Sequence, residues 1–210
     1  RFLLTVDKAH EIMSQGRVGD SFGELRQIEL QAEGYSHPTE WRKSAEQNGG
    51  GVFIDGGIHF VDVMLRLGGF PESVYAIQPP QLFTDVEGED GIVMTARLSG
   101  GVPAIINFSR STPIREKPPM VHLTGTKGKL SFVPYGRELS VETLQVRRTV
   151  RVAAPRRGVR QMVSEFRAAI EEDREPVMSG HEAIRDLAIV LAAYESARTG
   201  QVVNLSEPHS

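Results

Sequence analysis

Residues 91–111 read GIVMTARLSGGVPAIINFSRS, two short alternating segments separated by Ser99-Gly100-Gly101. Apolar and polar side chains alternate in both segments, which is the pattern of strands that bury one face. The serine and the two glycines are typical of a turn. Because so short a turn leaves no room for the crossover that parallel strands need, we predict an antiparallel pair.

The same pattern continues in both directions from this pair, from about Ser73 to Val152. Further short segments rich in β-branched residues are separated by turn signals such as Pro79-Pro80 and Tyr135-Gly136. These segments are SVYAIQ (73–78), MVHLTG (120–125), GKLSFV (128–133) and ELSVETLQVRR (138–148). Together with an earlier alternating segment at residues 22–34, they predict an open, mainly antiparallel sheet of about six to nine strands.

Helical spacing of apolar residues marks the segments around these strands. The predicted helices cover residues 1–18, with a stop at Gly16, 52–67, about 162–173 and 179–200, and a last short strand follows at VVNL (202–205). This order predicts an α+β fold in which helices cover one face of the sheet. The other face must be hydrated or buried against a second copy, so we predict homo-oligomerisation through the open sheet face.

Composition excludes several classes of protein. The chain has 210 residues, of which 40% are hydrophobic, and a net charge of −3, which favours neither a nucleic-acid binder nor a disordered acidic tail. It has no cysteine, so disulfides and thiolate catalysis are excluded, and we expect a reducing, cytoplasmic location. No apolar run reaches the ~20 residues of a membrane span, and no signal peptide opens the chain. Because the first residue is Arg1 rather than Met, we expect that part of the protein precedes it.

The charge is unevenly distributed along the chain. Residues 110–160 hold 12 Lys or Arg against three acids, whereas the remainder holds 12 basic residues and 24 acids. A functional interpretation is a basic surface for a phosphorylated ligand or an acidic partner. The alternative is that strands carry Arg and Lys on a hydrated face, with acids opposite them in space.

The predicted helix at 52–67 carries the residues with the most chemical potential. Asp55, His59, Asp62 and Arg66 lie at i, i+4, i+7 and i+11, which predicts that all four share one face. Histidine flanked by carboxylates is well suited to exchange protons near neutral pH. Two alternatives stay open: a hydrated surface of ion pairs, and a metal site of Asp55 and His59 completed by His37 or Asp62.

Glycines surround the start of this helix. Gly49, Gly50 and Gly51 precede it, and Gly56 and Gly57 lie inside it. Each interior glycine costs roughly 1 kcal/mol relative to alanine, so stability alone does not explain them. A helix start rich in glycine offers open N–H groups and allows close approach of a cofactor or of another element of the protein.

A long irregular segment, YSHPTEWRKSAEQNGGG (residues 35–51), precedes the helix and holds the only Trp. Long loops in compact domains are often functional. We regard Tyr35, His37, Trp41 and Arg42 as candidates for lining a pocket. The alternatives are that Trp41 is a core anchor and that Tyr35 and His37 are surface residues of the loop.

The stretch GGGVFIDGGIHFVDVMLRLGG (residues 49–69) resembles the glycine-led helix with a D-x-x-x-H core of the Gfo/Idh/MocA family. Other segments are similar in the same order along nearly the whole chain. They are DKAHEIMSQGRVGD (7–20), the pair Trp41-Arg42, HLTGTKGKLSF (122–132) and the tail FRAAIEEDREPVMSGHEAIRDLAIVLAAYESARTGQVVNL (166–205).

The resemblance implies a two-domain oxidoreductase that transfers hydride between NAD or NADP and a sugar, cyclitol or related polyol. Residues 1–18 would be the remnant of the junction with a Rossmann domain, which is absent here. Residues 19–210 would be the substrate-binding and oligomerisation domain, with a fold like the C-terminal domain of glyceraldehyde-3-phosphate dehydrogenase. No G-x-G-x-x-G follows a strand in this chain, so NAD or NADP would be bound mainly by the missing domain, and the fragment alone would be inactive.

By position in the family motif, His59 would be the catalytic acid/base, and Asp55 would bind substrate hydroxyls or orient His59. The resemblance places the substrate near Trp41 and Arg42, with Tyr35 and His37 as further candidates. Gly49, Gly50 and Gly51 would lie near the cofactor, Asp62 would support the helix face, and no metal is implied. Glu116-Lys117-Pro118 matches the family's catalytic E-K-P motif, but it follows the glycine helix instead of preceding it, so we do not assign catalysis to Lys117. The alternative function is a non-catalytic domain for assembly or ligand sensing.

Overall fold

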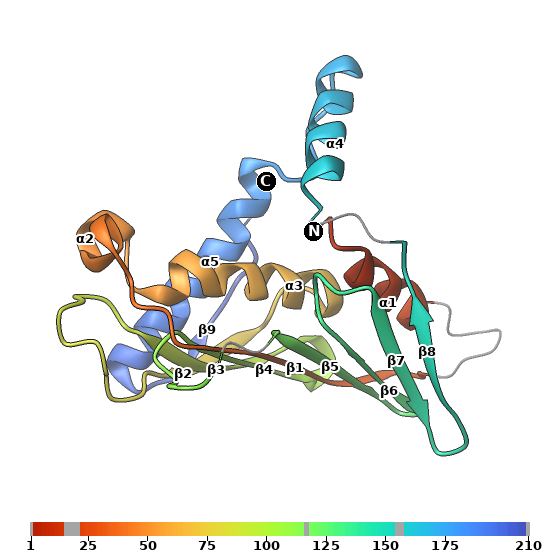
Figure 1. Ribbon diagram of the computed structural model, residues 1–210, viewed down its shortest axis with the longest axis horizontal. Helices are drawn as coiled ribbons and strands as arrows, with labels where there is room; N and C mark the ends of the chain where they lie inside the picture. Colours follow the sequence, from red (N-terminus) through yellow and green to blue (C-terminus); the bar gives the residue numbers. More distant parts are fainter. Residues whose placement is uncertain (1, 15–21, 116–117, 154–157, 209–210) are drawn as a thin grey trace.

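The computed structural model describes residues 2–14, 22–115, 118–153 and 158–208. They form one open sheet with the strand order β8-β7-β6-β5-β1-β4-β3-β2-β9, and helices lie over one of its faces (Figure 1). The strands are β1 (Leu25–Glu33), β2 (Ser73–Ile77), β3 (Gly91–Arg97), β4 (Pro103–Ser109), β5 (Met120–Gly125), β6 (Gly128–Phe132), β7 (Glu138–Thr143), β8 (Arg147–Arg151) and β9 (Val203–Asn204). The helices are α1 (Leu4–Ser14), α2 (Ala45–Asn48), α3 (Ile58–Gly68), α4 (Val159–Glu171) and α5 (Gly180–Thr199), with short turns η1 (Glu40–Lys43), η2 (Phe53–Gly57) and η3 (Ser99–Gly101).

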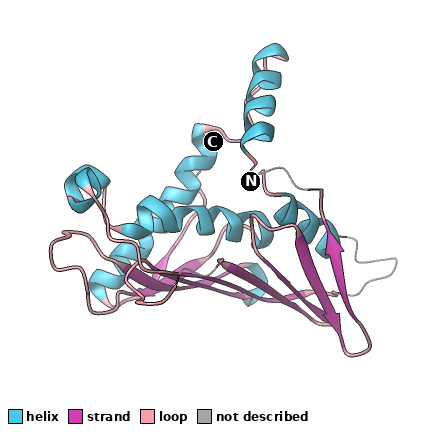
Figure 2. Ribbon diagram, in the orientation of Figure 1, coloured by secondary structure: helices cyan, strands magenta, loops and turns pink. Residues whose placement is uncertain are grey.

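The predicted α+β class and the strand count are confirmed, and Figure 2 shows the separation of helices from the sheet. The pair at residues 91–111 is antiparallel as predicted, with Gly91 opposite Ser109 and Arg97 opposite Pro103. The first helix ends at Ser14, and its predicted stop, Gly16, lies outside the described residues. No helix in the described part of the chain is long and apolar enough to cross a membrane.

One pairing departs from the antiparallel pattern. β1 inserts between β4 and β5 and runs parallel to β4, with Ile28 opposite Ala104 and Glu33 opposite Ser109. The chain between β1 and β4 contains α2, η2 and α3, which supply the crossover that a parallel pair requires. This insertion brings the loop after β1 beside the end of β4, where Tyr35 bridges to Ser111.

Alternation along the strands places the core between the sheet and the helices. On β3, Ile92, Met94 and Ala96 are buried, whereas Val93 and Thr95 face the opposite side. The core face packs against α3 and α5, and α1 packs against α3. Because α3 is enclosed in this way, most of its side chains are buried, and this fixes the position of the turn η2 in front of it.

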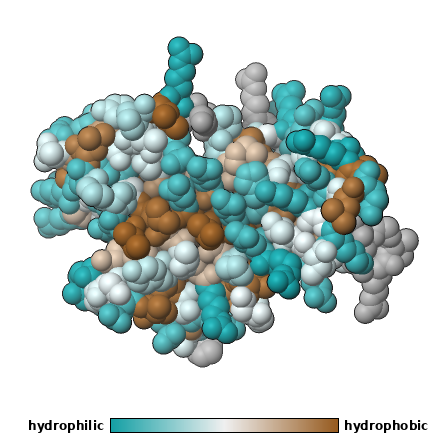
Figure 3. Space-filling model, turned by 90° about the horizontal axis from the view of Figure 1, so that it is seen from below, coloured by the Kyte–Doolittle hydropathy of each residue, from teal (hydrophilic) through white to brown (hydrophobic). Residues whose placement is uncertain are grey.

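Within the part of the chain that the structure describes, none of the five α-helices lies over the opposite face of the sheet (Figure 1). Figure 3 views this face and shows an apolar area near its middle. The exposed apolar side chains on this side include Ile77 of β2 and Val93 of β3. A shallow hollow of about 230 Å³ lies beside them, lined in part by Tyr75, Thr95 and Val202.

Helix α4 projects away from the sheet (Figure 1), and Ala169 is its one buried residue. The sequence predicts an amphipathic helix here, which is confirmed, but its apolar side chains are exposed. They are Val159, Met162, Val163, Phe166 and Ile170. The helix begins beside the start of the chain, since a Cβ at Gly158 would lie 2.2 Å from the carbonyl oxygen of Phe2.

Candidate functional site

The helix predicted at residues 52–67, which we call the glycine helix, consists of the turn η2 followed by α3. Backbone N–H groups at its start donate to Glu89 and Tyr194. The Glu89 carboxylate accepts from the backbone of Phe53, and the Tyr194 hydroxyl accepts from the backbone of Ile54. The distances are 2.7 Å from Phe53 N to Glu89 Oε1, 3.1 Å from Ile54 N and 3.2 Å from Gly51 N to Tyr194 Oη, and 2.9 Å from Val52 N to the Glu89 carbonyl oxygen. The expectation of open N–H groups is therefore wrong, because these first donors are occupied within the chain.

The same two residues explain why glycine is needed at this turn. A Cβ on Gly51 would lie 2.0 Å from Glu89 Oε2 and 2.2 Å from its carbonyl oxygen. Gly50 has a φ of +151°, and a Cβ there would lie 2.7 Å from the ring of Tyr194. Gly49 ends α2 in a left-handed conformation. The close approach predicted for Gly50 and Gly51 is thus made by another element of the protein, while their proximity to a cofactor stays a prediction.

Glu89 and Tyr194 also bind each other, since the Tyr194 hydroxyl donates to Glu89 Oε1 over 3.0 Å. Burial raises the pKa of both side chains, and the hydrogen bonds that Glu89 accepts from Phe53 and Tyr194 only partly oppose this for the carboxyl. The clamp formed by Glu89 and Tyr194 fixes the turn η2, which carries Asp55.

Asp55 and His59 are both exposed, one on the π-helical turn η2 and the other in the first turn of α3. Asp55 Oδ2 accepts from Arg42 Nε over 3.1 Å, so the loop before the helix orients this carboxylate. The sequence predicts that Asp62 and Arg66 share one polar helix face with Asp55 and His59. This prediction is wrong for Asp62, which is buried and only 7% exposed. The wider π-helical turn changes the spacing at Asp55, and α3 is enclosed by the sheet and by neighbouring helices.

A polar cleft of about 420 Å³ opens beside Asp55, within the size range of small-molecule sites. It brings together three predicted residues, His37, Arg42 and Asp55. Its full lining is Ser36, His37, Pro38, Thr39, Arg42, Asn48, Val52, Asp55, Gly56 and Arg110. His59 follows one turn after Asp55 on the same continuous helix but does not line the cleft.

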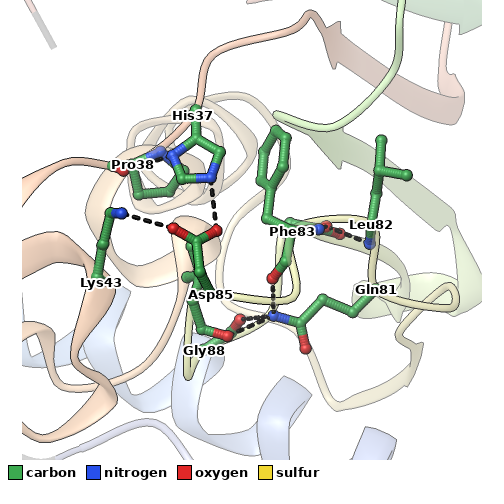
Figure 4. Close-up of polar contacts among 10 residues, drawn as sticks. His37, Pro38, Lys43, Gln81, Leu82, Phe83, Asp85 and Gly88 are labelled. Carbon is green, nitrogen blue, oxygen red and sulfur yellow. Dashed lines mark hydrogen bonds and ion pairs between the residues drawn. The ribbon is translucent and has the colours of Figure 1, made fainter.

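His37 is fixed at the cleft by an ion-pair cluster (Figure 4). Its Nδ1 lies 2.8 Å from the carbonyl oxygen of Pro38, and its Nε2 lies 2.8 Å from Asp85 Oδ1. Hydrogen bonds from Lys43 and His37 lower the pKa of Asp85 to about 2. The cluster joins the loop before α2 to the loop before β3.

The family model for the oxidoreductase family, C-terminal alpha/beta domain, named for Gfo/Idh/MocA, matches residues 18–205. The chain belongs to this family. The curated relative 1,5-anhydro-D-fructose reductase of Ensifer adhaerens is 27% identical over 174 residues, which cover 80% of this chain and 52% of that protein. The chain therefore spans about half the length of this relative.

Solved structures share the fold of this Gfo/Idh/MocA domain. Aldose-aldose oxidoreductase from Caulobacter crescentus, complexed with glycerol, superposes with a TM-score of 0.84 at 22% identity, covering 98% of this chain and 62% of that chain. Levoglucosan dehydrogenase in complex with NADH and L-sorbose gives a TM-score of 0.82 at 19% identity, covering 95% and 62%. At these identities the likeness concerns the fold.

The remaining predicted pocket residues of the Gfo/Idh/MocA domain lie outside the cleft lining. Tyr35 packs edge-on against Phe83, with ring centroids 5.4 Å apart. Trp41 is 43% exposed and lies 4.3 Å below the guanidinium carbon of Arg42, so the core-anchor alternative for Trp41 is wrong. It supports the residue that holds Asp55, because a cation and an aromatic face attract each other.

Sequence reasoning missed Arg110, Asn48, Glu89 and Tyr194. The first two line the cleft, and the last two form the clamp. Arg110 follows the end of β4, and the parallel β1–β4 pairing brings it beside the loop after β1, where Ser36 N donates to its carbonyl oxygen. Glu89 lies in the turn-like segment GEDG (88–91), where the sequence predicts an ordinary exposed acidic residue. No signal along the chain identifies these contacts.

The metal alternative is not supported by the described residues, and the E-K-P match lies outside them. Among residues 2–14, 22–115, 118–153 and 158–208, no group of three His, Asp or Glu could hold a metal ion. His37, one proposed third ligand, is bound to Asp85, and Asp62 is buried. Lys117 and Glu116 lie outside the described residues.

Replacing Glu89 by Gln should remove a pH dependence of stability. Burial raises the pKa of this carboxyl above its ordinary 4.5, so the folded protein binds the proton more tightly than the unfolded chain. The free energy of unfolding of the wild type should therefore fall, relative to Glu89→Gln, as the pH rises from about 4.5 through the raised pKa. Urea unfolding of both proteins between about pH 4 and about pH 8 measures this difference, and a constant difference contradicts the expectation.

Proposed function

We propose that this chain is the substrate-binding domain of a nicotinamide-dependent oxidoreductase that acts on a sugar, cyclitol or related polyol. The observation that carries the proposal is the polar cleft beside the glycine helix, where Arg42 orients Asp55. Membership of an oxidoreductase family supports it. So do the names of relatives that reduce or oxidise sugars, although each name describes that protein.

NAD or NADP would be held mainly by a dinucleotide-binding domain that precedes these residues in the full-length protein. The clamp supports this division, because the N–H groups of residues 51–54 are occupied by Glu89 and Tyr194 and are not available to a pyrophosphate. The cofactor supplies hydride acceptance and donation. The present domain would supply the substrate contacts and the acid/base.

In this proposal, His59 takes the proton of the reacting substrate hydroxyl as hydride leaves the carbon that bears this hydroxyl. A neutral imidazole is suited to this step near neutral pH. Asp55 accepts hydrogen bonds from substrate hydroxyls, and Arg42 and Asn48 donate to substrate oxygens across the cleft. Asp55 is held by Arg42, so its carboxylate is oriented before the substrate arrives.

Cofactor titrations and an activity assay test the roles proposed for the two domains. The full-length protein and the 210-residue chain are titrated with NAD and NADP by calorimetry, and the full-length protein is assayed for nicotinamide reduction with a panel of sugars and polyols. We expect binding and turnover with the full-length protein and no binding by the chain alone at millimolar concentration. Tight binding by the chain alone would show that this domain holds the cofactor and would contradict the proposal. Cofactor binding by the full-length protein without turnover of any polyol would favour the ligand-sensing alternative.

The exposed apolar face of α4 would contact the preceding domain, because α4 begins beside Phe2 and the chain covers 52% of its relative. Replacing Phe166 by Asp in the full-length protein should weaken this contact by at least about 2 kcal/mol, the scale of one buried aromatic side chain. Hydrogen exchange of α4 should then become faster. Ser164→Asp, on the polar side of the helix, is the matched control. Equal exchange in both variants would contradict the contact.

The open sheet face would be the surface through which copies of the protein associate. Val93 lies on this face and is 42% exposed, so Val93→Arg introduces a charge among apolar side chains. Light scattering of the full-length protein should show an oligomer for the wild type and a smaller species for this variant. Glu46→Arg, on α2 at the helix side, should leave the mass unchanged. A wild type that is strictly monomeric rules out this role of the sheet.

A further inference from the structure

One irregular segment forms most of the wall of the cleft beside Asp55. Six of the ten residues that line the cleft lie between Ser36 and Asn48, and we call residues 36–48 the cleft segment. Its regular structure consists of the short turn η1 and the four-residue helix α2, so few of its backbone groups are held by secondary structure. Its shape must therefore come from contacts with other parts of the chain.

The backbone of Glu40 shows that this shape is imposed on the cleft segment. Its φ of +54° lies in the left-handed region, which residues other than glycine adopt rarely and at a cost. Such a conformation persists where the surrounding structure enforces it. Because Glu40 comes two residues before Arg42, the turn at Glu40 helps to set the place where Arg42 meets Asp55.

Asp85 holds the cleft segment at two points (Figure 4). Its Oδ1 lies 2.8 Å from His37 Nε2, and its Oδ2 accepts from Lys43 Nζ over 2.5 Å. The ring of His37 also packs on Phe83, with centroids 4.5 Å apart. These contacts fix both the part of the segment that carries His37 and the end of η1.

Glu87 holds the junction between η1 and α2. Its Oε2 accepts from Ser44 Oγ over 3.0 Å and from Ala45 N over 2.8 Å. Its own backbone N–H donates to the carbonyl oxygen of Lys43 over 2.8 Å. The start of α2 is therefore attached to Glu87 through both side chain and backbone.

The loop that carries these two acids is itself held in one shape. Gln81 Nε2 lies 2.6 to 3.0 Å from the carbonyl oxygens of Phe83, Val86 and Gly88, so one side-chain amide ties the loop together (Figure 4). Asp90, which is 1% exposed, accepts from two backbone N–H groups of the same loop. Residues 81–90 thus form a fixed support, which we call the brace loop.

On its other side, the cleft segment contacts the turn that carries Asp55. Asn48 Nδ2 donates to the carbonyl oxygen of Gly51 over 2.8 Å, and Arg42 Nε donates to Asp55 Oδ2 over 3.1 Å. A continuous series of contacts therefore runs from the brace loop to Asp55. The acids of the brace loop lie outside the cleft lining, so they reach the cleft through this segment.

We propose that Asp85 and Glu87 are positioning residues, which hold the cleft segment in the shape that binds the substrate. The proposal rests on the function proposed above and adds to it the part of the chain that sets substrate affinity. Without the two carboxylates, the segment would have to be ordered when the substrate binds, and this ordering would weaken binding. Cofactor binding would not change, because it is assigned to the preceding domain.

The double variant Asp85→Ala/Glu87→Ala of the full-length protein tests the proposal. Steady-state kinetics use the sugar or polyol that the wild type oxidises fastest in the panel described above. We expect KM for this substrate to rise ~10-fold or more, since displacement of a substrate-positioning segment by about 1 Å has effects of this size or larger. The KM for the nicotinamide should stay the same, and kcat should change less than the substrate KM, as for a loss of uniform binding.

Thermal unfolding and a control variant separate positioning from damage to the fold. Both acids are exposed, and exposed ion pairs contribute little to stability, so the double variant should melt close to the wild type. The control is Glu138→Ala/Glu142→Ala, which removes two exposed acids that pair with Arg151 and Arg147 across β7 and β8. These pairs fit the interpretation of a hydrated strand face with acids opposite, and the control should keep the wild-type KM.

Glu87→Gln distinguishes a hydrogen-bonding role from an effect of charge. The amide oxygen of glutamine still accepts from Ser44 and Ala45, so this variant should keep most of the substrate affinity that Glu87→Ala loses. A KM as high for Glu87→Gln as for Glu87→Ala would show that the charge, and not the hold on the cleft segment, matters. That result would overturn the proposal for Glu87.

Hydrogen exchange of residues 36–48 gives a result that does not depend on turnover. The amides of the cleft segment should exchange faster in Asp85→Ala/Glu87→Ala than in the wild type or in the control variant. Unchanged exchange, or an unchanged substrate KM in a protein that oxidises the sugar, rejects the role of the two acids and leaves the oxidoreductase in place. Faster exchange in a protein that oxidises no sugar or polyol would keep the hold on the cleft segment and reject the proposed function.

Discussion

Replacing His59 by Ala in the full-length protein is expected to lower turnover at neutral pH by ~100-fold or more, the usual scale for a lost acid/base. The hydroxyl proton of the substrate then has no acceptor at the moment when hydride leaves. His59 is exposed at the start of α3, so the fold should be unaffected. Steady-state kinetics across pH measure the effect, and the limb of the wild-type profile that reports the base should disappear.

His181→Ala is the matched control for this prediction, because His181 is an exposed histidine in the first turn of α5. It should keep wild-type turnover. Turnover of His59→Ala that equals that of the wild type would remove His59 from the mechanism. A fall in turnover accompanied by a clear loss of thermal stability would indicate a structural role instead.

Replacing Gly51 by Ala is expected to destabilise the protein by at least about 2 kcal/mol, because overpacking a tight contact forces the backbone to move. The added methyl would lie 2.0 to 2.4 Å from three atoms of Glu89, two of them in the backbone. Glu89 cannot yield without loosening its hydrogen bond from Phe53, and the turn that carries Asp55 would move with it. Turnover should therefore fall together with stability.

Gly180→Ala serves as the comparison for Gly51→Ala. Gly180 begins α5, and a Cβ there meets nothing within 4 Å. Urea unfolding should give a stability close to that of the wild type for Gly180→Ala and a clear loss for Gly51→Ala. Equal stability of the two variants would show that the approach of Glu89 to this turn is not tight.

Local patterns in the sequence predict most of the fold. Alternation at residues 91–111 determines which side chains of β3 and β4 are buried, and the helix predicted at 179–200 is α5, at whose start the Ser179 side chain accepts from Glu182 N. The position of β1 between β4 and β5 could not be predicted in this way. Strand neighbours depend on contacts between distant segments, which alternation within one strand does not encode.

The candidate site was predictable only in part, for the same reason. Asp55 and Arg42 are 13 residues apart in a recognisable motif, and the structure brings them within hydrogen-bond distance. Glu89, Tyr194 and Arg110 come from three other segments, and their roles arise only when the sheet and α5 assemble. The glycines indicated a close approach at the helix start, but the sequence could not say that Glu89 makes it.

Deuterium transfer tests hydride chemistry at this site most directly. A sugar that the full-length protein oxidises is prepared with deuterium on the carbon that bears the reacting hydroxyl, and the nicotinamide product is analysed by mass spectrometry. We predict that the deuterium appears in the reduced nicotinamide in proportion to the sugar oxidised, and far more slowly for His59→Ala. Deuterium that stays in the sugar product or is released into water would contradict direct hydride transfer and, with it, the function proposed for this domain.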